Sequence, residues 1–232
     1  MNIIKTFKQV ENSPVRSICK LRNSTRADGK RVYFTPEGLS YPSITTILGS
    51  FPKPELEEWR NRVGWQEAEK IGRQAAQKGT AIHGLCEKFV QNQEIISKDF
   101  MPFEYQQFLY IKEELINHVD NIHGLEKTLR SDRLKIAGTT DLIAEWDGEL
   151  AIVDYKGSTR QKEKGWITDY FLQATAYSCM LYERTGLQAK KIVILISVDH
   201  EGSQVFVENT SDWIDKLLKK LKVYRETIAC SD

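Results

Sequence analysis

Two aspartates and a lysine stand out among the residues whose types and spacing could do chemistry. Asp141 and Asp154 are thirteen positions apart, and Lys156 follows the second aspartate after a single residue. In a β-strand side chains alternate between the two faces, so Asp154 and Lys156 project from one face, roughly 6.6 Å apart along the strand. Neighbouring carboxylates suit magnesium or manganese, and a nearby ammonium group suits developing negative charge. The set could therefore support metal-assisted hydrolysis of a phosphate ester.

The segments around the two aspartates predict a pair of strands joined by a tight turn. Residues 136–146 are rich in β-branched and aromatic residues, and residues 149–156 contain an apolar run. Between them, Asp147-Gly148 is typical of a two-residue hairpin turn. Each aspartate lies six residues from its own side of this dipeptide, so the hairpin brings the two carboxylates together across the ladder. The alternative is an ordinary ion pair at a strand end.

Length and composition favour a soluble globular protein with its own hydrophobic core. At 232 residues and 41% hydrophobic content, the chain suits one large domain. No apolar stretch approaches the ~20 residues that span a bilayer, so no membrane association is expected. We expect a single domain, 1–232, with four parts: a basic arm or strand (1–30), a helical wall (31–122), an αβ core (123–210) and a C-terminal helix (211–232).

Charge and cysteine content narrow the functional classes. The net charge of +1 argues against coating nucleic acid by bulk electrostatics, so phosphate contacts must come from local patches. The four cysteines lack the spacing of a zinc site or a disulfide framework. The chain is expected to act inside a cell, in a bacterial or phage-infected cytoplasm or in an organelle. Its basic first 30 residues fit a targeting segment or a flexible arm.

Hydrophobic periodicity places further elements along the chain. A short helix capped by Ser43 follows a strand at 31–34, and residues 54–91 form two helices that are broken near Gly64. The other expected helices cover 101–119, 167–184 (stopped by Gly186) and 211–228 (capped by Ser211). The other expected strands cover 125–129, 189–198 and, at a sheet edge, 204–207.

Two helical positions are further candidates for the site. His83 and Glu87 share a helix face with Gly72 and Gly79, and those small residues would allow a close approach. A lone helical histidine is more often a packing residue than a metal ligand, but glycines within a helix cost about 1 kcal/mol each and call for a reason. Close packing onto a metal site would supply one.

Other polar residues could contact the metal site or a phosphate backbone. Gln173 and Tyr177 are four apart on a helix and would project side by side, although an ordinary packing role is the alternative. At the start of another helix, hydroxyl groups could bind phosphate, while Ser43 could equally be a cap. A glycine-bounded loop could hold phosphates or be solvated. The candidate DNA-binding residues are Ser43, Thr45, Thr46, Ser158, Arg160, Lys162 and Lys164.

Taken together, these motifs resemble the PD-(D/E)XK nuclease superfamily, specifically its RecB-like branch. The likeness covers roughly residues 31–200. The matching pieces are Tyr41 to Leu48, Gly79 to His83, Glu126, Gly138 to Asp141, Asp154 to Lys156 and Gln173 to Tyr177.

The resemblance implies a role for each matching residue. Asp141 and Asp154 correspond to metal ligands and Lys156 to the catalytic lysine. His83 corresponds to an additional ligand, and Tyr155 would lend its backbone carbonyl to the metal. The remaining matches are catalytic or supporting residues: Gln173 and Tyr177 in a Gln-x-x-x-Tyr motif, with Glu126 and Glu87 outside the direct ligands.

The resemblance also implies a fold and an activity. We expect an α/β protein with a restriction-endonuclease-like mixed sheet flanked by helices, using Mg²⁺ or Mn²⁺ and no iron-sulfur cluster. The expected activity is exonuclease action on single-stranded DNA ends in replication, repair or recombination, where proteins of those processes could be partners. The alternatives are an endonuclease or duplex exonuclease, a non-catalytic nucleic-acid-binding module, and a globular protein that binds no metal.

Overall fold

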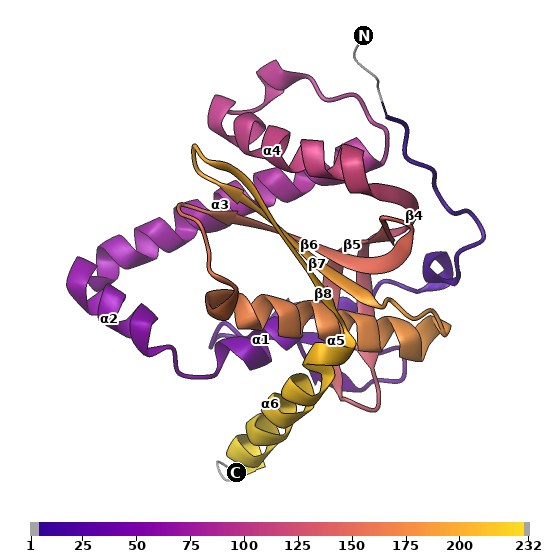
Figure 1. Ribbon diagram of the computed structural model, residues 1–232. Helices are drawn as coiled ribbons and strands as arrows, with labels where there is room; N and C mark the ends of the chain where they lie inside the picture. The colour runs from indigo at the N-terminus through magenta and orange to yellow at the C-terminus, as the bar shows by residue number, and fades with distance from the viewer. Residues whose placement is uncertain (1–4, 230–232) are drawn as a thin grey trace.

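A five-stranded mixed sheet forms the centre of the molecule (Figure 1), in a computed structural model that describes residues 5–229. Its strands stand in the order β4-β5-β6-β7-β8. The first three strands are antiparallel to one another, β6 and β7 are parallel, and β8 is antiparallel to β7. The strands are β4 (Val119–Ser131), β5 (Ile136–Trp146), β6 (Glu149–Ser158), β7 (Lys191–Val198) and β8 (Gly202–Asn209).

The predicted hairpin between β5 and β6 is confirmed. Asp147 and Gly148 both have positive φ, 50° and 80°, as a type I′ turn requires. Trp146 and Glu149 pair directly on either side of the turn. The parallel pair β6 and β7 needs a crossover, which α5 (Thr168–Thr185) provides before it ends at Gly186 in the left-handed conformation.

Helices cover both faces of the sheet (Figure 1). On one face, α5 packs over Ile152, Ile194 and Ile196, together with α1 (Ile44–Gly49) and α6 (Ser211–Ala229). The opposite face lies against α3 (Trp65–Val90) and α4 (Pro102–His118). Alternate residues of β6 and β7 therefore enter different cores, as expected for strands buried on both sides.

The N-terminal segment belongs to the folded body over the residues that the structure describes. Phe7 is buried in the α3–α4 core, and Ile122 exchanges backbone hydrogen bonds with Lys8 and Val10. A 3₁₀ helix (Pro14–Ser17) and a small antiparallel sheet follow. Of the two expectations for residues 1–30, a basic arm or a strand, the described part contains a strand. The small sheet consists of β1 (Arg22–Thr25), β2 (Arg31–Phe34) and β3 (Ser40–Pro42).

A helical arm extends from the body of the molecule (Figure 1). It consists of α2 (Pro54–Val63) and the first half of α3, and the predicted break falls at Gly64. Within the described residues 54–81, Ala68 is the one buried side chain. The remainder of α3 packs against the sheet, on the face that α4 also covers. The segment 31–122, expected as a helical wall, thus also contains β2, β3 and α1, and α1 lies on the other face.

The start of one strand and the cap of one helix differ from those predicted. Strand β4 begins at Val119 instead of Leu125, because two register shifts and positive φ angles at Asn121 and Glu126 disturb its alternation. Helix α6 starts at Ser211 itself, whose hydroxyl donates to Asp212, so the expected capping role of Ser211 was wrong.

In residues 5–229, no helix is long and apolar enough to cross a membrane.

Truncating the α4 core should destabilise the protein. Leu115 is fully buried in the α3–α4 core. Leu115→Ala should lower the free energy of unfolding by about 2–5 kcal/mol, because it removes apolar contacts and leaves a cavity. Leu39→Ala is the matched control, since Leu39 is 53% exposed. Urea denaturation measures both, and equal losses would contradict this assignment of the core.

Candidate active site

The candidate site lies where β5 separates from β6. Their ladder runs from the turn as far as Leu142 and Val153, and β6 then continues beside β7 alone. Asp141 and Asp154 are the next residues in this register, so they face each other at the point of separation. The backbone of Tyr155 consequently lacks a β5 partner. Its N–H donates to Asp141 Oδ2 (2.9 Å), and its carbonyl accepts from His83 Nε2 (2.8 Å).

His83 brings α3 to this gap. Because Tyr155 O can only accept, Nε2 carries a hydrogen, and Nδ1 lies 3.3 Å from Asp141 Oδ1. Burial lowers the pKa of His83, but the Asp141 carboxylate outweighs that effect and the pKa is raised. A proton on Nδ1 therefore links His83 to Asp141, and a cation could take the place of that proton.

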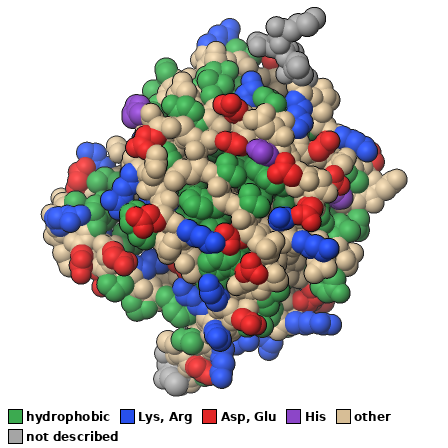
Figure 2. Space-filling model, in the orientation of Figure 1, with side chains coloured by type: hydrophobic (Ala, Val, Ile, Leu, Met, Phe, Trp, Pro, Cys, Tyr) green, Lys and Arg blue, Asp and Glu red, His purple; other side chains and the backbone are tan. Residues whose placement is uncertain are grey.

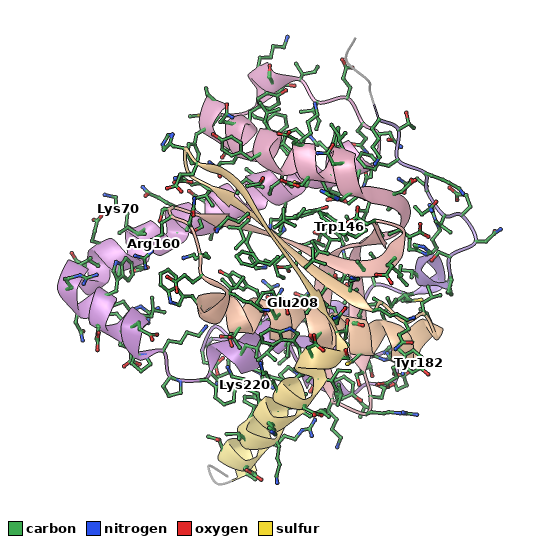
Figure 3. All side chains as sticks on the ribbon, viewed as in Figure 1. Lys70, Trp146, Arg160, Tyr182, Glu208 and Lys220 are labelled. Atoms are coloured by element: carbon green, nitrogen blue, oxygen red, sulfur yellow. The ribbon has the colours of Figure 1, made fainter. Side chains whose placement is uncertain are left out.

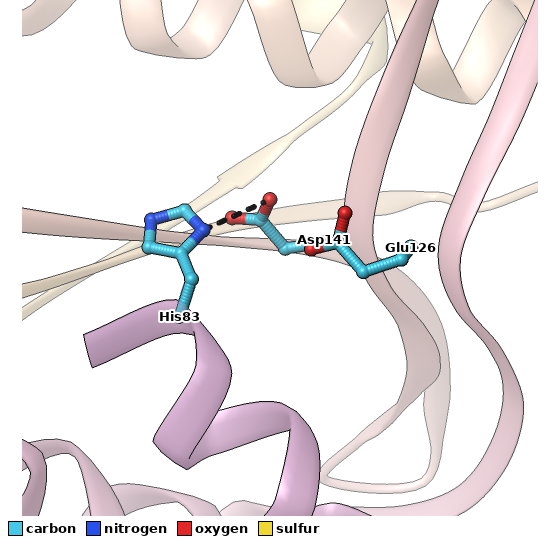
Figure 4. Close-up of side chains that lie close together, drawn as sticks. All are labelled: His83, Glu126 and Asp141. Carbon is cyan, nitrogen blue, oxygen red and sulfur yellow. Dashed lines mark ion pairs between the residues drawn. The ribbon is translucent and has the colours of Figure 1, made fainter. Parts of the chain in front are cut away.

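Glu126 completes a cluster with His83 and Asp141 (Figure 4). On β4 the flanking pairs Leu125–Leu142 and Lys127–Thr140 put Glu126 opposite Asp141, and the φ of 46° at Glu126 interrupts the ladder there. One ligand atom from each of the three side chains lies within 4.8 Å of the others. Partial burial and the Asp141 charge raise the pKa of Glu126 to about 7.

The donor set of this cluster fits one divalent cation. Two carboxylates supply hard oxygen ligands, and an imidazole supplies one nitrogen. Metal-binding histidines generally donate their second ring N–H to a carbonyl or carboxylate, and His83 donates to Tyr155 O. Glu87, one helical turn beyond His83, adds negative charge near Glu126 and accepts a hydrogen bond from Gln91.

A second cluster surrounds Asp154, which is 1% exposed. Its Oδ2 forms an ion pair with the Lys156 ammonium, and its Oδ1 accepts from Gln173 Nε2 at 3.1 Å. The same amide nitrogen lies 3.3 Å from the Tyr177 hydroxyl. The predicted proximity of Gln173 and Tyr177 is thus present. Lys156 also lies over the Tyr170 ring, 5.1 Å from its centroid.

Charge compensation explains how this second cluster is tolerated. Burial raises the pKa of Asp154 to about 6, with Lys156 opposing the rise and Asp141 adding to it. Burial lowers the pKa of Lys156, but Asp154 and Asp141 more than compensate, so the pKa is raised. Lys156 is therefore a permanent cation at neutral pH.

The arrangement differs from the sequence expectation in three respects. Asp154 lies outside the three-residue cluster, held by Lys156 and Gln173, whereas Glu126, expected outside the ligands, lies within it. Tyr155 O is used by His83 but keeps a second lone pair. The roles of Asp154 and Tyr155 as metal ligands stay predictions. The helical glycines have no described atom within 4 Å of an added Cβ, so the packing explanation for them was wrong.

Gly138 is a site residue for which the sequence suggested no role. A Cβ there would lie 2.6 Å from Tyr177 Cε1 and 3.2 Å from the Tyr177 hydroxyl oxygen. Strand β5 therefore needs a glycine for the Tyr177 ring to lie against its backbone. Its place in a Gly-Thr-Thr-Asp sequence just before Asp141 was the available signal.

The candidate phosphate-binding residues differ in whether their side chains are exposed and free of other partners. Ser43 is buried and caps α1 by accepting from Thr46 N at 3.0 Å, so the predicted cap is confirmed; Thr45 is exposed. In the β6–α5 loop, Lys164 pairs with Glu208, and Ser158 donates to Arg160 O. Across residues 5–229, no acidic side chain lies within ion-pairing distance of Arg160 or Lys162. Their positive charges remain available, although contact with DNA stays a prediction.

A mixed sheet flanked by helices, with a buried aspartate and a lysine where two strands separate, has the fold expected of a nuclease. A family model for the PD-(D/E)XK nuclease superfamily matches residues 55–229, and the chain belongs to that superfamily. It is similar to mitochondrial genome maintenance exonuclease 1 from Mus musculus, with 28% identity over 60% of this chain and 43% of that protein. The Homo sapiens protein is 24% identical over 80% of this chain and 58% of its own length.

The chain thus spans about half the length of these curated relatives. Among solved structures, a candidate exonuclease from Eubacterium rectale aligns with a TM-score of 0.47 and 12% identity. That alignment covers 67% of this chain and 66% of the other.

Adding a methyl group at Gly138 should disturb the site. Gly138→Ala should cost about 1–3 kcal/mol of unfolding free energy, because the Tyr177 ring must move. Gly157→Ala is the control on the neighbouring strand, where a Cβ would meet only Ile82 Cδ1 at 3.7 Å. Denaturant unfolding compares the two, and a Gly138→Ala protein as stable as Gly157→Ala would rule out the tight contact.

Proposed function

We propose that this protein is a metal-dependent DNA exonuclease that hydrolyses phosphodiester bonds from single-stranded ends during replication, repair or recombination. The observation that carries the proposal is that two clusters meet at the backbone of Tyr155 on β6. Asp141 connects them, because it bonds to His83 and to the backbone N–H of Tyr155, between Asp154 and Lys156. A cation-binding group and a buried lysine thus lie side by side.

His83, Glu126 and Asp141 would hold the metal, which is Mg²⁺ or Mn²⁺ in this proposal. When bound, such a cation stabilises negative charge on the phosphate and makes water more nucleophilic. Asp154 is a further ligand in this proposal, and rotation of its carboxylate toward Asp141 would require it to leave Gln173 or Lys156.

Lys156 stabilises charge in this mechanism. The Asp154 and Asp141 carboxylates raise its pKa, so its ammonium keeps its proton while those charges are not offset by a cation. In this form it would attract the attacking water or an oxygen of the phosphate, whereas deprotonation of the water by Lys156 would need the bound cation to lower that pKa. Gln173 positions Asp154 through its amide, and Tyr177 fixes that amide in turn.

DNA as substrate and cleavage from an end are supported by the relatives, whose names describe exonucleases of genome maintenance. Basic and acidic side chains are interspersed over the face in Figure 2, in keeping with the small net charge. Attraction of a strand must therefore be local, and Arg160 and Lys162 beside the site supply it. The arm of α2 and α3 would bound the path of one strand.

Removal of the proposed ligands should weaken metal binding. Asp141→Asn and His83→Ala should each reduce the affinity for Mn²⁺ at least about 10-fold, since each removes a donor from the cluster. His118→Ala is the control, because His118 also lies beside carboxylates, 2.8 Å from Asp147 Oδ1, but outside the cluster. Calorimetric titration measures the affinity, and equal binding by Asp141→Asn and wild type would refute the site.

Cleavage assays test the activity itself. With Mg²⁺ or Mn²⁺, the protein should release nucleotides from end-labelled linear single-stranded DNA but leave circular DNA intact. Lys156→Met and Asp154→Asn should each lower the rate by about 10²–10³-fold, because each removes an electrostatic group. The control is Lys191→Met, which breaks the ion pair between Lys191 on β7 and Glu149 on β6.

Each other outcome points to a different function. Efficient cutting of circles would indicate an endonuclease, and preference for duplex ends would indicate a duplex exonuclease. Salt-sensitive DNA binding without metal-dependent release of nucleotides would indicate a binding module. A flat Mn²⁺ titration would leave a globular protein without a metal site.

A further inference from the structure

Trp166 is a large aromatic side chain left open to solvent next to the candidate site. It lies in the 3₁₀ helix η3 (Lys164–Ile167) and is 58% exposed. The following residue, Ile167, is 2% exposed and packs in the α5 core. The backbone at this point is therefore anchored, while the indole ring points outward.

The loop that carries Trp166 is fixed to the edge strand β8. The side-chain amide of Gln204 accepts from Lys162 N (2.7 Å) and donates to Lys162 O (3.2 Å). Lys164 pairs with Glu208 on the same strand, and Trp166 N donates to Glu163 O. These contacts hold in one arrangement a loop whose sequence predicted only flexible cations, so little ordering entropy remains to be lost on binding.

Positive charge accompanies the ring. The Arg160 guanidinium lies over Trp166, 5.4 Å from its centroid, and the indole is still largely exposed with Arg160 in place. Figure 3 shows Arg160 on the side of the molecule where the arm extends, far from Tyr182 at the other end of α5. An exposed aromatic plane with a cation beside it is the combination that binds single-stranded nucleic acid.

The Trp166 ring is close in sequence to Tyr170, which contacts the Lys156 side chain of the candidate site. Tyr170, whose ring lies beside Lys156, follows Trp166 by four residues. Four residues of 3₁₀ and α-helix advance only roughly 6–8 Å along the helix axis, so Trp166 lies about one turn before Tyr170.

We propose that Trp166 stacks on a nucleobase of the DNA strand close to the scissile phosphate, while Arg160 contacts an adjacent phosphate. This inference rests on the proposed function, and it adds a residue that positions the strand. Every base presents a flat face, so the contact tolerates any sequence and suits an enzyme that shortens a strand stepwise.

Binding without cleavage tests the stack. Fluorescence anisotropy with a chelator present measures the affinity for a labelled single-stranded oligonucleotide and for a series with one abasic site at each position from the end. Wild type should lose about 5- to 150-fold in affinity at one position of the series. Trp166→Ala should bind the intact oligonucleotide about as weakly as wild type binds the oligonucleotide with that abasic site. An abasic site at that position should then lower the affinity of Trp166→Ala little further. Trp166→Phe should recover part of the difference.

The salt dependence of binding distinguishes the loss of a stacking contact from disruption of the whole loop, which would also remove phosphate contacts. Trp166→Ala should leave the slope of log affinity against log salt unchanged, whereas Arg160→Ala should reduce it by about 0.7, the value for one phosphate contact with a single strand. Tyr182→Ala is the matched control, because Tyr182 is an equally exposed aromatic residue (59%), on α5 and far from Arg160. It should change neither quantity.

Two failures can be distinguished. If Trp166→Ala still discriminates against the abasic position as wild type does, stacking by Trp166 is wrong while the nuclease proposal stands. If wild type neither binds nor cleaves single-stranded DNA with added metal, the proposed function fails and the stack with it. Thermal unfolding of Trp166→Ala at the wild-type temperature would establish that the variant is folded.

Discussion

The loss of one strand partner at Tyr155 is the constraint on which the site depends. A buried backbone N–H and carbonyl must find partners, and β5 no longer supplies them beyond Leu142. Asp141 and His83 satisfy the two groups with side chains. The same two bonds orient one carboxylate and one imidazole toward each other. Strand separation therefore creates the space for the site and also fixes the residues that fill it.

Electrostatic balance follows from this geometry. Three acidic groups, Glu126, Asp141 and Asp154, meet in and beside a partly buried gap, and burial disfavours their charged forms. Lys156 offsets the charge on one side and His83 on the other. In the metal-free structure the raised pKa of His83 favours a proton shared with Asp141. The three side chains of the cluster therefore lie together without a cation.

Sequence reasoning reached the elements that follow simple periodicity. The β5–β6 hairpin, the crossover helix α5 and the interrupted pair α2–α3 were visible from apolar spacing and turn residues. Glu126 was expected outside the ligands on the family resemblance, and the two register shifts in its strand hide from the sequence which side chains share a face. The role of Gly138 depends on its close approach to Tyr177, and the loop of Trp166 depends on the bonds between Lys162 and Gln204. Spacing along a chain does not reveal such tertiary neighbours. The sequence therefore predicted the type of chemistry better than it predicted the side-chain contacts.

The helical arm has a consequence for how such a protein can diverge. Because α2 contributes no buried side chain among its described residues, the two hydrophobic cores do not depend on it. Insertions, deletions or charge reversals there would leave the hydrophobic packing that stabilises the sheet unchanged. The sequence of this arm can accordingly change without disturbing the packing around Asp141 and Asp154, so proteins that share the sheet can differ in this segment.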